Sequence, residues 1–383
     1  MTLRARRPAL LVLALGACAL APRDDAPRDD APRDDAPRDD DTAALAERTA
    51  ARALDWLWTQ QTADGRVPST TYGVLRAGWS LTASALAATA QLPADLRAPH
   101  AAAIARAVAC LRAATAADGS IGLDSDAIDY PTYTAAHWLA ALVRLQPDGW
   151  RELAAQQVER LRSVQLDESL GWRPDDEFYG AFGFGIRRER APLGSGLVDI
   201  ALQRTVLEAL RAAGVAPDDP TFVRAAAFVL RCQQPDGGFC FTPGPDFRRS
   251  KAGDEQAADG SLRGRSYGTT TADGLRALRA CGRGEDDPAV AAARAWLAAH
   301  AAVLPVPGLP LDAEPPTEPA LRFYWWSTLA AVSPTAALRA ELVRTLALRQ
   351  REDGAFTGDS DRMKEDDPLV ATCLALFALA PAL

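Results

Sequence analysis

The sequence predicts an all-α protein built from six helical hairpins in two layers. The chain of 383 residues is 48% hydrophobic and rich in Ala and Leu, which suit closely packed helices. A helix that ends in Gln and leads into an Asp-Gly turn recurs along the chain. A second helix with one apolar face follows each turn, and such a face must pack against another layer.

Composition and charge exclude several classes of protein. The net charge of −8 and the pI of about 5.1 argue against a nucleic-acid partner. Three His and six Cys are too few and too scattered for a multi-metal protein, and no cofactor is expected. No apolar run reaches the roughly 18–20 residues that a transmembrane helix needs.

Residues 1–17 predict a signal peptide, with a basic start followed by a short apolar segment. Leu15-Gly16-Ala17-Cys18 then resembles the bacterial lipobox, although Gly16 departs mildly from the common pattern. The resemblance implies cleavage before Cys18, a lipid on Cys18, and export to the periplasmic face of a membrane. Because Ala19 is not Asp, the outer membrane is the expected destination. An ordinary cleaved signal peptide is the alternative.

Residues 18–41 predict a disordered tether. Ala21 to Asp40 repeats Ala-Pro-Arg-Asp-Asp four times and contains no large apolar residue. Such a stretch cannot bury enough surface to offset its ordering entropy, and its prolines and excess negative charge extend it. It is interpreted as a spacer in front of the domain at residues 42–383, or as repeat expansion that has no function.

The first helix of each hairpin is recognised by the turn that follows it. Trp56 to Gln61 leads into the first of these turns, and Trp296-Leu297 marks a fifth unit whose Pro-rich loop has lost the Asp-Gly. The other five units keep a Gly at the turn: Asp64-Gly65, Asp118-Gly119, Gly171-Trp172, Asp236-Gly237 and Asp353-Gly354.

Four of the second helices carry a Thr followed by Ala or Cys one turn before a large apolar residue, as in Thr271-Ala272 with Leu275, and the helices with Gln203 and Ser327 at this position fit the pattern loosely. They are predicted at Trp79–Gln91, Thr132–Leu145, Val198–Ala213, Thr269–Cys281, Phe323–Val332 and Leu369–Leu379.

The repeated unit resembles a known family. Gln233 to Phe239, its sharpest copy, is similar to the QW motif of squalene–hopene cyclases and to the Gly-Gly-Phe turns of protein prenyltransferase β subunits. The resemblance spans roughly residues 45–383. It implies an α/α toroid, with six inner helices around a central cavity and six outer helices. It also implies structural roles for the Asp-Gly turns and for Gln60, Gln233 and Gln350.

The catalytic motifs of that family are not matched. Class II terpene cyclases carry D-x-D-D-T-A, and the corresponding stretch here is Tyr267 to Ala272, with Thr269 and Thr270 where acids belong. A Thr hydroxyl cannot protonate an alkene. The prenyltransferase zinc site is not expected, since the sixth unit has no His. Cys232 and Cys240 flank the fourth turn and are candidates for a local disulfide.

These observations predict a toroid that binds a hydrophobic or peptide ligand in its central cavity. The alternatives are an enzyme of the terpene cyclase/mutase type with displaced acids, and a scaffold for a protein partner. The candidate ligand-binding residues are Tyr267, Thr269, Thr270 and Asp273, which stand where cyclases hold their acid.

The beginnings of the inner helices are predicted to surround the ligand, because they expose unpaired N–H groups. Helix capping is the competing explanation for the hydroxyl groups at these positions. The residues concerned are Thr82, Thr134, Gln203, Thr271, Ser327 and Thr372.

Overall fold

The computed structural model describes residues 39–122, 129–185, 198–243, 250–332 and 335–383. Cys18 and nearly all of the predicted tether lie outside the described residues. Residues Pro37–Leu383 form one unit. Its first helix, α1 (Asp39–Thr59), already begins within the last three residues of the predicted tether.

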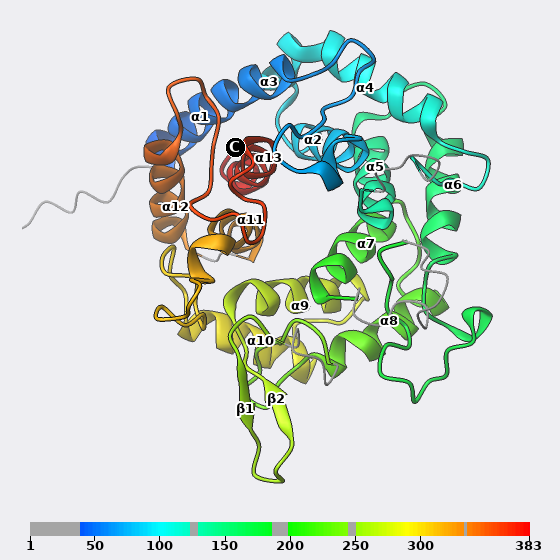
Figure 1. The fold of residues 1–383 in the computed structure, drawn as a ribbon, viewed down its shortest axis with the longest axis vertical. Coiled ribbons are helices and arrows are strands. Elements are labelled where there is room, and N and C mark those ends of the chain that lie inside the picture. The colour runs from blue at the N-terminus through cyan, green and yellow to red at the C-terminus, as the bar shows by residue number, and fades with distance from the viewer. Residues whose placement is uncertain (1–38, 123–128, 186–197, 244–249, 333–334) are drawn as a thin grey trace, which may run out of the picture. The chain divides into compact units, whose positions relative to one another are not determined.

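In the described part of the chain six helices form an inner ring. Their colours run from blue to red around the centre of Figure 1. Each packs against the next, and α13 packs against α2, which closes the ring. All six were predicted, with ends that differ by one or two residues. They are α2 (Trp79–Ala90), α5 (Pro131–Leu145), α7 (Ile200–Ala212), α9 (Gly268–Ala280), α11 (Arg322–Val332) and α13 (Pro368–Leu379).

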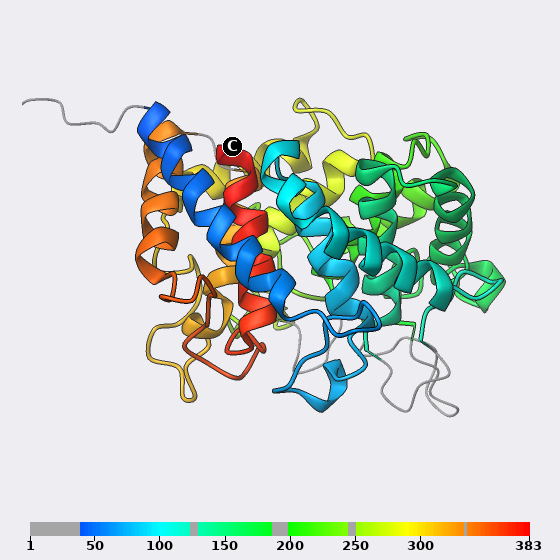
Figure 2. The same ribbon diagram turned by 90° about the horizontal axis from the view of Figure 1, so that it is seen from above.

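Six further helices surround this ring, so the fold is the predicted all-α toroid. The short helix α3 (Ala94–Arg97) lies between two of the long ones, and the hairpin of β1 (Asp254–Gln256) and β2 (Leu262–Gly264) projects outward (Figure 1). Figure 2 shows the long loops after α1, α10 and α12 at one end of the ring. The outer helices are α1, α4 (Ala101–Ala114), α6 (Trp150–Arg162), α8 (Pro220–Arg231), α10 (Pro288–Ala299) and α12 (Ala336–Arg349).

Local sequence explains where many of these helices begin. Several start with a side chain that accepts a hydrogen bond from a backbone N–H of the first turn, which satisfies a group the helix itself cannot. Three of them also carry Pro at the first helical position, where no N–H is needed. The capping residues are Asp199, Asp219, Asp287, Thr335 and Asp367.

A glutamine after an outer helix ties that helix to the next one. The Gln233 amide nitrogen donates to the Gly237 carbonyl at 3.1 Å and to the Ala289 carbonyl, at the start of α10, at 2.9 Å. Gln350 donates to the carbonyls of Gly354 and Thr49, both at 2.9 Å. The second bond joins the last outer helix to the first.

After α1 the contacts that correspond to those of Gln233 and Gln350 are made by Gln61, the neighbour of Gln60. Gln61 donates to the carbonyls of Gly65 at 3.0 Å and Ala103 at 2.9 Å. Gln60 is exposed and bonds only within the last turn of α1. The physical reason is the helical rotation of about 100° per residue, which turns one of two adjacent glutamines toward α4 and the other toward solvent.

We expect Gln350→Ala to lower the free energy of unfolding by about 1–3 kcal/mol, because two buried carbonyls lose their donor. Gln60→Ala is the matched control and is expected to change stability by less than about 0.5 kcal/mol. Urea denaturation of the full chain measures both. Equal effects of the two substitutions would contradict a ring-closing role for Gln350.

Candidate functional site

A cavity of about 340 Å³ lies inside the inner ring. Each of the six inner helices contributes side chains to its wall, for example Ser84 of α2, Ala201 of α7 and Leu374 of α13. The apolar part of the wall is largely aromatic, and its rings are those of Tyr130, Tyr133, Phe184, Phe241, Tyr267 and Tyr324.

Three of these rings pack edge to face in one corner of the cavity. The centroids of Tyr130 and Phe184 lie 5.8 Å apart, and Tyr133 lies 6.2 Å from Tyr130 and 5.9 Å from Phe184. Tyr130 has a φ of 41°, a left-handed conformation that is rare for a residue with a bulky side chain. Its surroundings must therefore stabilise it, and such residues cluster at functional sites.

Aromatic residues that are close in the sequence divide between the cavity wall and the core. Phe184 and Tyr324 reach the cavity. Trp325 and Trp326 are buried in the core, where their indole N–H groups donate to the carbonyls of Ala302 and Val303 at 3.0 Å. The two residues that follow Tyr324 on the chain therefore have a structural role.

A buried charged network forms one wall of the cavity. The Arg204 Nε donates to Asp273 Oδ1 at 3.0 Å, and the Tyr324 hydroxyl donates to Asp273 Oδ2 at 2.9 Å. Arg204 also donates to the Tyr324 hydroxyl oxygen at 3.1 Å. Burial raises the pKa of Asp273, and the positive charges of Arg204 and Arg276 oppose this rise. Both carboxylate oxygens are thus engaged by neighbouring side chains.

Asp199 and Lys251 form a second polar group on the cavity wall. Asp199 caps α7 by accepting from the Leu202 N–H at 2.8 Å. Burial raises its pKa to about 6, against the opposing effects of that N–H and of Lys251. The Lys251 Nζ lies 3.1 Å from the centroid of the Phe241 ring. Burial lowers the Lys251 pKa to about 8, although Asp199 and Asp273 favour the charged form. Both groups can therefore change protonation state close to neutral pH.

Glu365 and His137 are the remaining titratable groups of note. Glu365 accepts from the backbone N–H groups of Phe323 at 2.9 Å and Tyr324 at 2.8 Å, and burial raises its pKa to about 8 against these donors. Burial lowers the His137 pKa to about 3, so its imidazole is neutral, and its Nδ1 has no hydrogen-bond partner. Glu365 anchors the start of α11, whereas His137 offers an unpaired ring nitrogen.

The four candidate ligand-binding residues all line the cavity. Tyr267 and Thr269 are almost fully buried, and Asp273 belongs to the network with Arg204. The Thr270 hydroxyl donates to the Phe239 carbonyl at 2.6 Å, so it is already satisfied within the protein. The sequence placed these residues at the cavity, and their hydrogen bonds serve mainly to build its wall.

The polar groups near the start of the inner helices are structural. Thr271 Oγ1 accepts from the Phe239 N–H at 3.1 Å and donates to the Tyr267 carbonyl at 2.9 Å. Thr82, Gln203 and Thr372 accept in the same way from a backbone N–H after the preceding turn, while Thr134 and Ser327 donate to carbonyls of their own helix. These bonds differ from N-capping, because four of the side chains accept from an N–H group of the preceding turn and thereby tie the inner helix to that turn.

Sequence reasoning missed Asp199, Lys251 and Glu365. Asp199 is the N-cap of α7, and Lys251 and Glu365 lie in loops, so none of them belongs to a repeating helical face. One signal was present for Lys251, because lysine is very rare in this chain.

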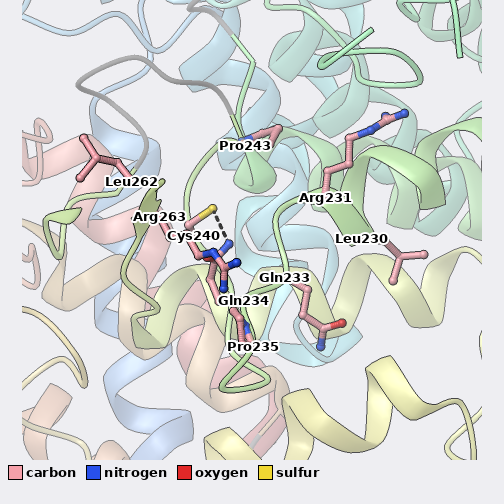
Figure 3. Close-up of a pocket in the computed structure, with 10 residues that line it drawn as sticks. Leu230, Arg231, Gln233, Gln234, Pro235, Cys240, Pro243, Leu262 and Arg263 are labelled. Carbon is pink, nitrogen blue, oxygen red and sulfur yellow. Dashed lines mark hydrogen bonds between the residues drawn. The ribbon is translucent and has the colours of Figure 1, made fainter. Parts of the chain in front are cut away.

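A second pocket, of about 490 Å³, lies at the base of the β1–β2 hairpin (Figure 3). Gln234 donates to the Cys240 Sγ at 3.3 Å and to the Cys232 carbonyl at 3.1 Å, which turns its polar end toward the backbone (Figure 3). Cys232 and Cys240 are adjacent across the turn but are not joined by a disulfide in the structure.

The described residues contain no group of three or more His, Cys, Asp and Glu side chains that could hold a metal ion. In the same part of the chain, no helix combines the length and the hydropathy needed to cross a membrane.

No protein-family model and no curated protein matches the sequence. The fold is similar to solved structures. The type II terpene cyclase MstE from Scytonema, without ligand, shares 15% identity with a TM-score of 0.57, over 89% of this chain and 99% of the cyclase. An unsaturated glucuronyl hydrolase specific for heparin shares 14% identity with a TM-score of 0.56, over 90% of this chain and 97% of that one. At these identities the similarity establishes the fold alone.

Proposed function

We propose that the toroid binds a mainly apolar small molecule in its central cavity. The observation that carries the proposal is the wall itself, in which six aromatic rings and aliphatic side chains such as Leu374 surround about 340 Å³. Small-molecule sites have this character, with an apolar lining and a few polar groups that fix orientation. Asp199 and Lys251 supply such polar groups. MstE, a protein of the same fold, has been solved with geranylgeranyl dihydroxybenzoate, which is consistent with this proposal.

The proposal predicts that Leu374→Trp fills the cavity and weakens binding of a fluorescent apolar dye, 1-anilinonaphthalene-8-sulfonate, by about tenfold or more. Leu348→Trp is the matched control, because Leu348 is 87% exposed on α12. Fluorescence titration of the full chain measures both affinities. Equal dye binding by the two variants would contradict the proposed site, and would favour the alternatives of a peptide ligand or a protein scaffold.

Acid-catalysed isomerisation of a terpenoid is the second candidate function. It is favoured by two carboxyl groups of raised pKa at an aromatic cavity, Glu365, whose pKa of about 8 keeps its proton at pH 7, and Asp199, whose pKa of about 6 allows it to hold a proton in mildly acidic solution, even though Thr269 and Thr270 replace the expected acids. Incubation of the purified chain with squalene and with geranylgeraniol, followed by gas chromatography, tests it. Product formation that Asp199→Asn abolishes supports catalysis, and unchanged substrate with wild-type protein excludes it for these compounds.

We further propose that the protein is exported and anchored by a lipid on Cys18, at the periplasmic face of a membrane. The support is the sequence Leu15 to Cys18 after a basic start, and the acidic Pro-containing repeat then serves as a spacer. Wild-type protein from bacterial cells is expected in the detergent phase of a Triton X-114 separation, and Cys18→Ala in the aqueous phase. Wild-type protein in the aqueous phase would contradict the anchor.

A further inference from the structure

Lysine is almost absent from this protein, and both of its lysines face the central cavity. The sequence contains 40 arginines and only two lysines, Lys251 and Lys364. Both line the cavity wall inside the ring. Everywhere else the chain uses arginine for its positive charges. The position of the two exceptions indicates that the cavity requires a property that lysine has and arginine lacks.

Recognition of an anion is not that property. The guanidinium group of arginine binds carboxylates and phosphates through two parallel hydrogen bonds, at least as well as an ammonium group does. The difference lies in the proton. Arginine remains protonated in proteins, whereas a lysine that is removed from water can lose its proton and become a nucleophile. A free amine is therefore the chemistry that distinguishes these two positions.

The surroundings single out Lys251. Its Nζ lies against the Phe241 ring, 3.1 Å from the centroid, in a largely apolar wall. Burial lowers its pKa to about 8, and the charged groups that face it, Asp199 and Asp273, reduce this shift but do not cancel it. Lys364 lies farther from its aromatic neighbours, with its Nζ 5.7 Å from the centroid of Tyr72.

We propose that Lys251 forms an imine with an apolar aldehyde or ketone bound in the cavity. This inference rests on the proposed function, since the cavity must first hold the apolar compound. The neutral Lys251 nitrogen attacks the carbonyl carbon, the π electrons move to the oxygen, and one proton passes from nitrogen to that oxygen to give a hydroxyl group. The Asp199 carboxylate takes the second proton from the nitrogen and delivers it to the hydroxyl, which leaves as water while the nitrogen lone pair forms the C=N bond. Both protons of the water come from the amine, so no oxidant or reductant is needed.

The test uses the full chain with decanal and sodium cyanoborohydride at pH 8, which reduces an imine to a stable secondary amine. Intact mass spectrometry is expected to show one adduct per chain, and peptide mapping is expected to place it on Lys251. Lys251→Arg keeps the positive charge and is expected to reduce the adduct by more than about tenfold. Lys364→Arg, the same change at the other lysine, is expected to retain it.

Decan-1-ol, which has the same chain but no carbonyl, separates this inference from the proposed function. If decan-1-ol displaces the fluorescent dye but decanal gives no adduct, the imine is overturned and apolar binding stands. If neither compound acts, both are overturned. An adduct at Lys364, or at both lysines equally, overturns the role of Lys251. Circular dichroism verifies folding of Lys251→Arg, and Lys251→Gln replaces it if the arginine variant is unfolded.

Discussion

Asp273→Ala is expected to lower the free energy of unfolding by about 3 kcal/mol, because it removes the carboxylate that Arg204 contacts at 3.0 Å and leaves this buried charge with only the longer contact to Glu208, at 3.5 Å. Only 1% of the Asp273 side chain and 14% of the Arg204 side chain are exposed, so water cannot compensate the loss. The Tyr324 hydroxyl also loses the acceptor that it now has at 2.9 Å. Urea denaturation of the full chain at pH 7, compared with wild type, measures the effect.

The double variant Arg204→Met/Asp273→Leu distinguishes an unpaired charge from simple loss of contacts. It removes both charges and fills their space with apolar groups, so we expect it to be less destabilising than Asp273→Ala alone. Glu208 retains its contact with Arg276 at 2.7 Å in this variant. Two results would contradict a coupled network. One is a loss of stability below about 1 kcal/mol in Asp273→Ala. The other is a loss in the double variant that equals the sum of the losses in Arg204→Met and Asp273→Leu.

The inner helices were predictable because the signals that define them are local. Helix α9 was expected at Thr269–Cys281 and is found at Gly268–Ala280, since its Thr-Ala face and apolar spacing are read within one helix. Closure of the ring depends on groups that are distant in sequence. The bond from Gln350 to the Thr49 carbonyl, for example, joins residues at opposite ends of the domain. Local patterns could not predict such a closed ring, and the toroid was predicted from the family resemblance.

The chemistry of the cavity was less accessible to sequence reasoning. Asp199 resembles any other helix-capping aspartate until its burial is known, and Asp287 caps α10 in the same manner with the opposite pKa shift. Lys251 lies in a loop and meets Asp199 only through the fold. Periodicity does distinguish buried from exposed faces, but in an inner ring one buried face packs in the core and another lines a cavity.

The fold by itself does not decide the reaction. The same ring is found in a terpene cyclase and in a glucuronyl hydrolase, so function must be argued from the side chains that reach the cavity. Thr269 and Thr270, at the positions where the family resemblance predicts acids, line the cavity here. Besides Asp273 of α9 and His137 of α5, titratable groups reach the cavity from the start of α7 and from the loops that carry Lys251 and Glu365.

Asp199→Asn is expected to stabilise the protein above pH 6, because burial of the carboxyl group raises its pKa from 3.8 to about 6. The folded state therefore binds more protons than the unfolded state between these values, and wild-type stability falls as pH rises from about 4 to 6. Above pH 6 the whole loss is present, and wild type has a free energy of unfolding about 3 kcal/mol lower than it would have with a neutral side chain at this position. Asparagine caps helices as well as aspartate does and carries no charge, so the variant lacks this fall.

Urea denaturation at pH 4 and pH 8 measures the change, with Asp287→Asn as the matched control at another helix start. Burial raises the pKa of Asp287, but the Arg283 guanidinium and the backbone N–H donors outweigh it and lower the pKa overall. Compared with wild type, Asp287→Asn should therefore be less stable at pH 8 than at pH 4. This is the opposite of the change expected for Asp199→Asn. If Asp199→Asn is also less stable than wild type at pH 8, the carboxylate is stabilising the fold. If it is more stable but no longer supports decanal adduct formation at Lys251, the buried acid is retained for chemistry at the expense of stability.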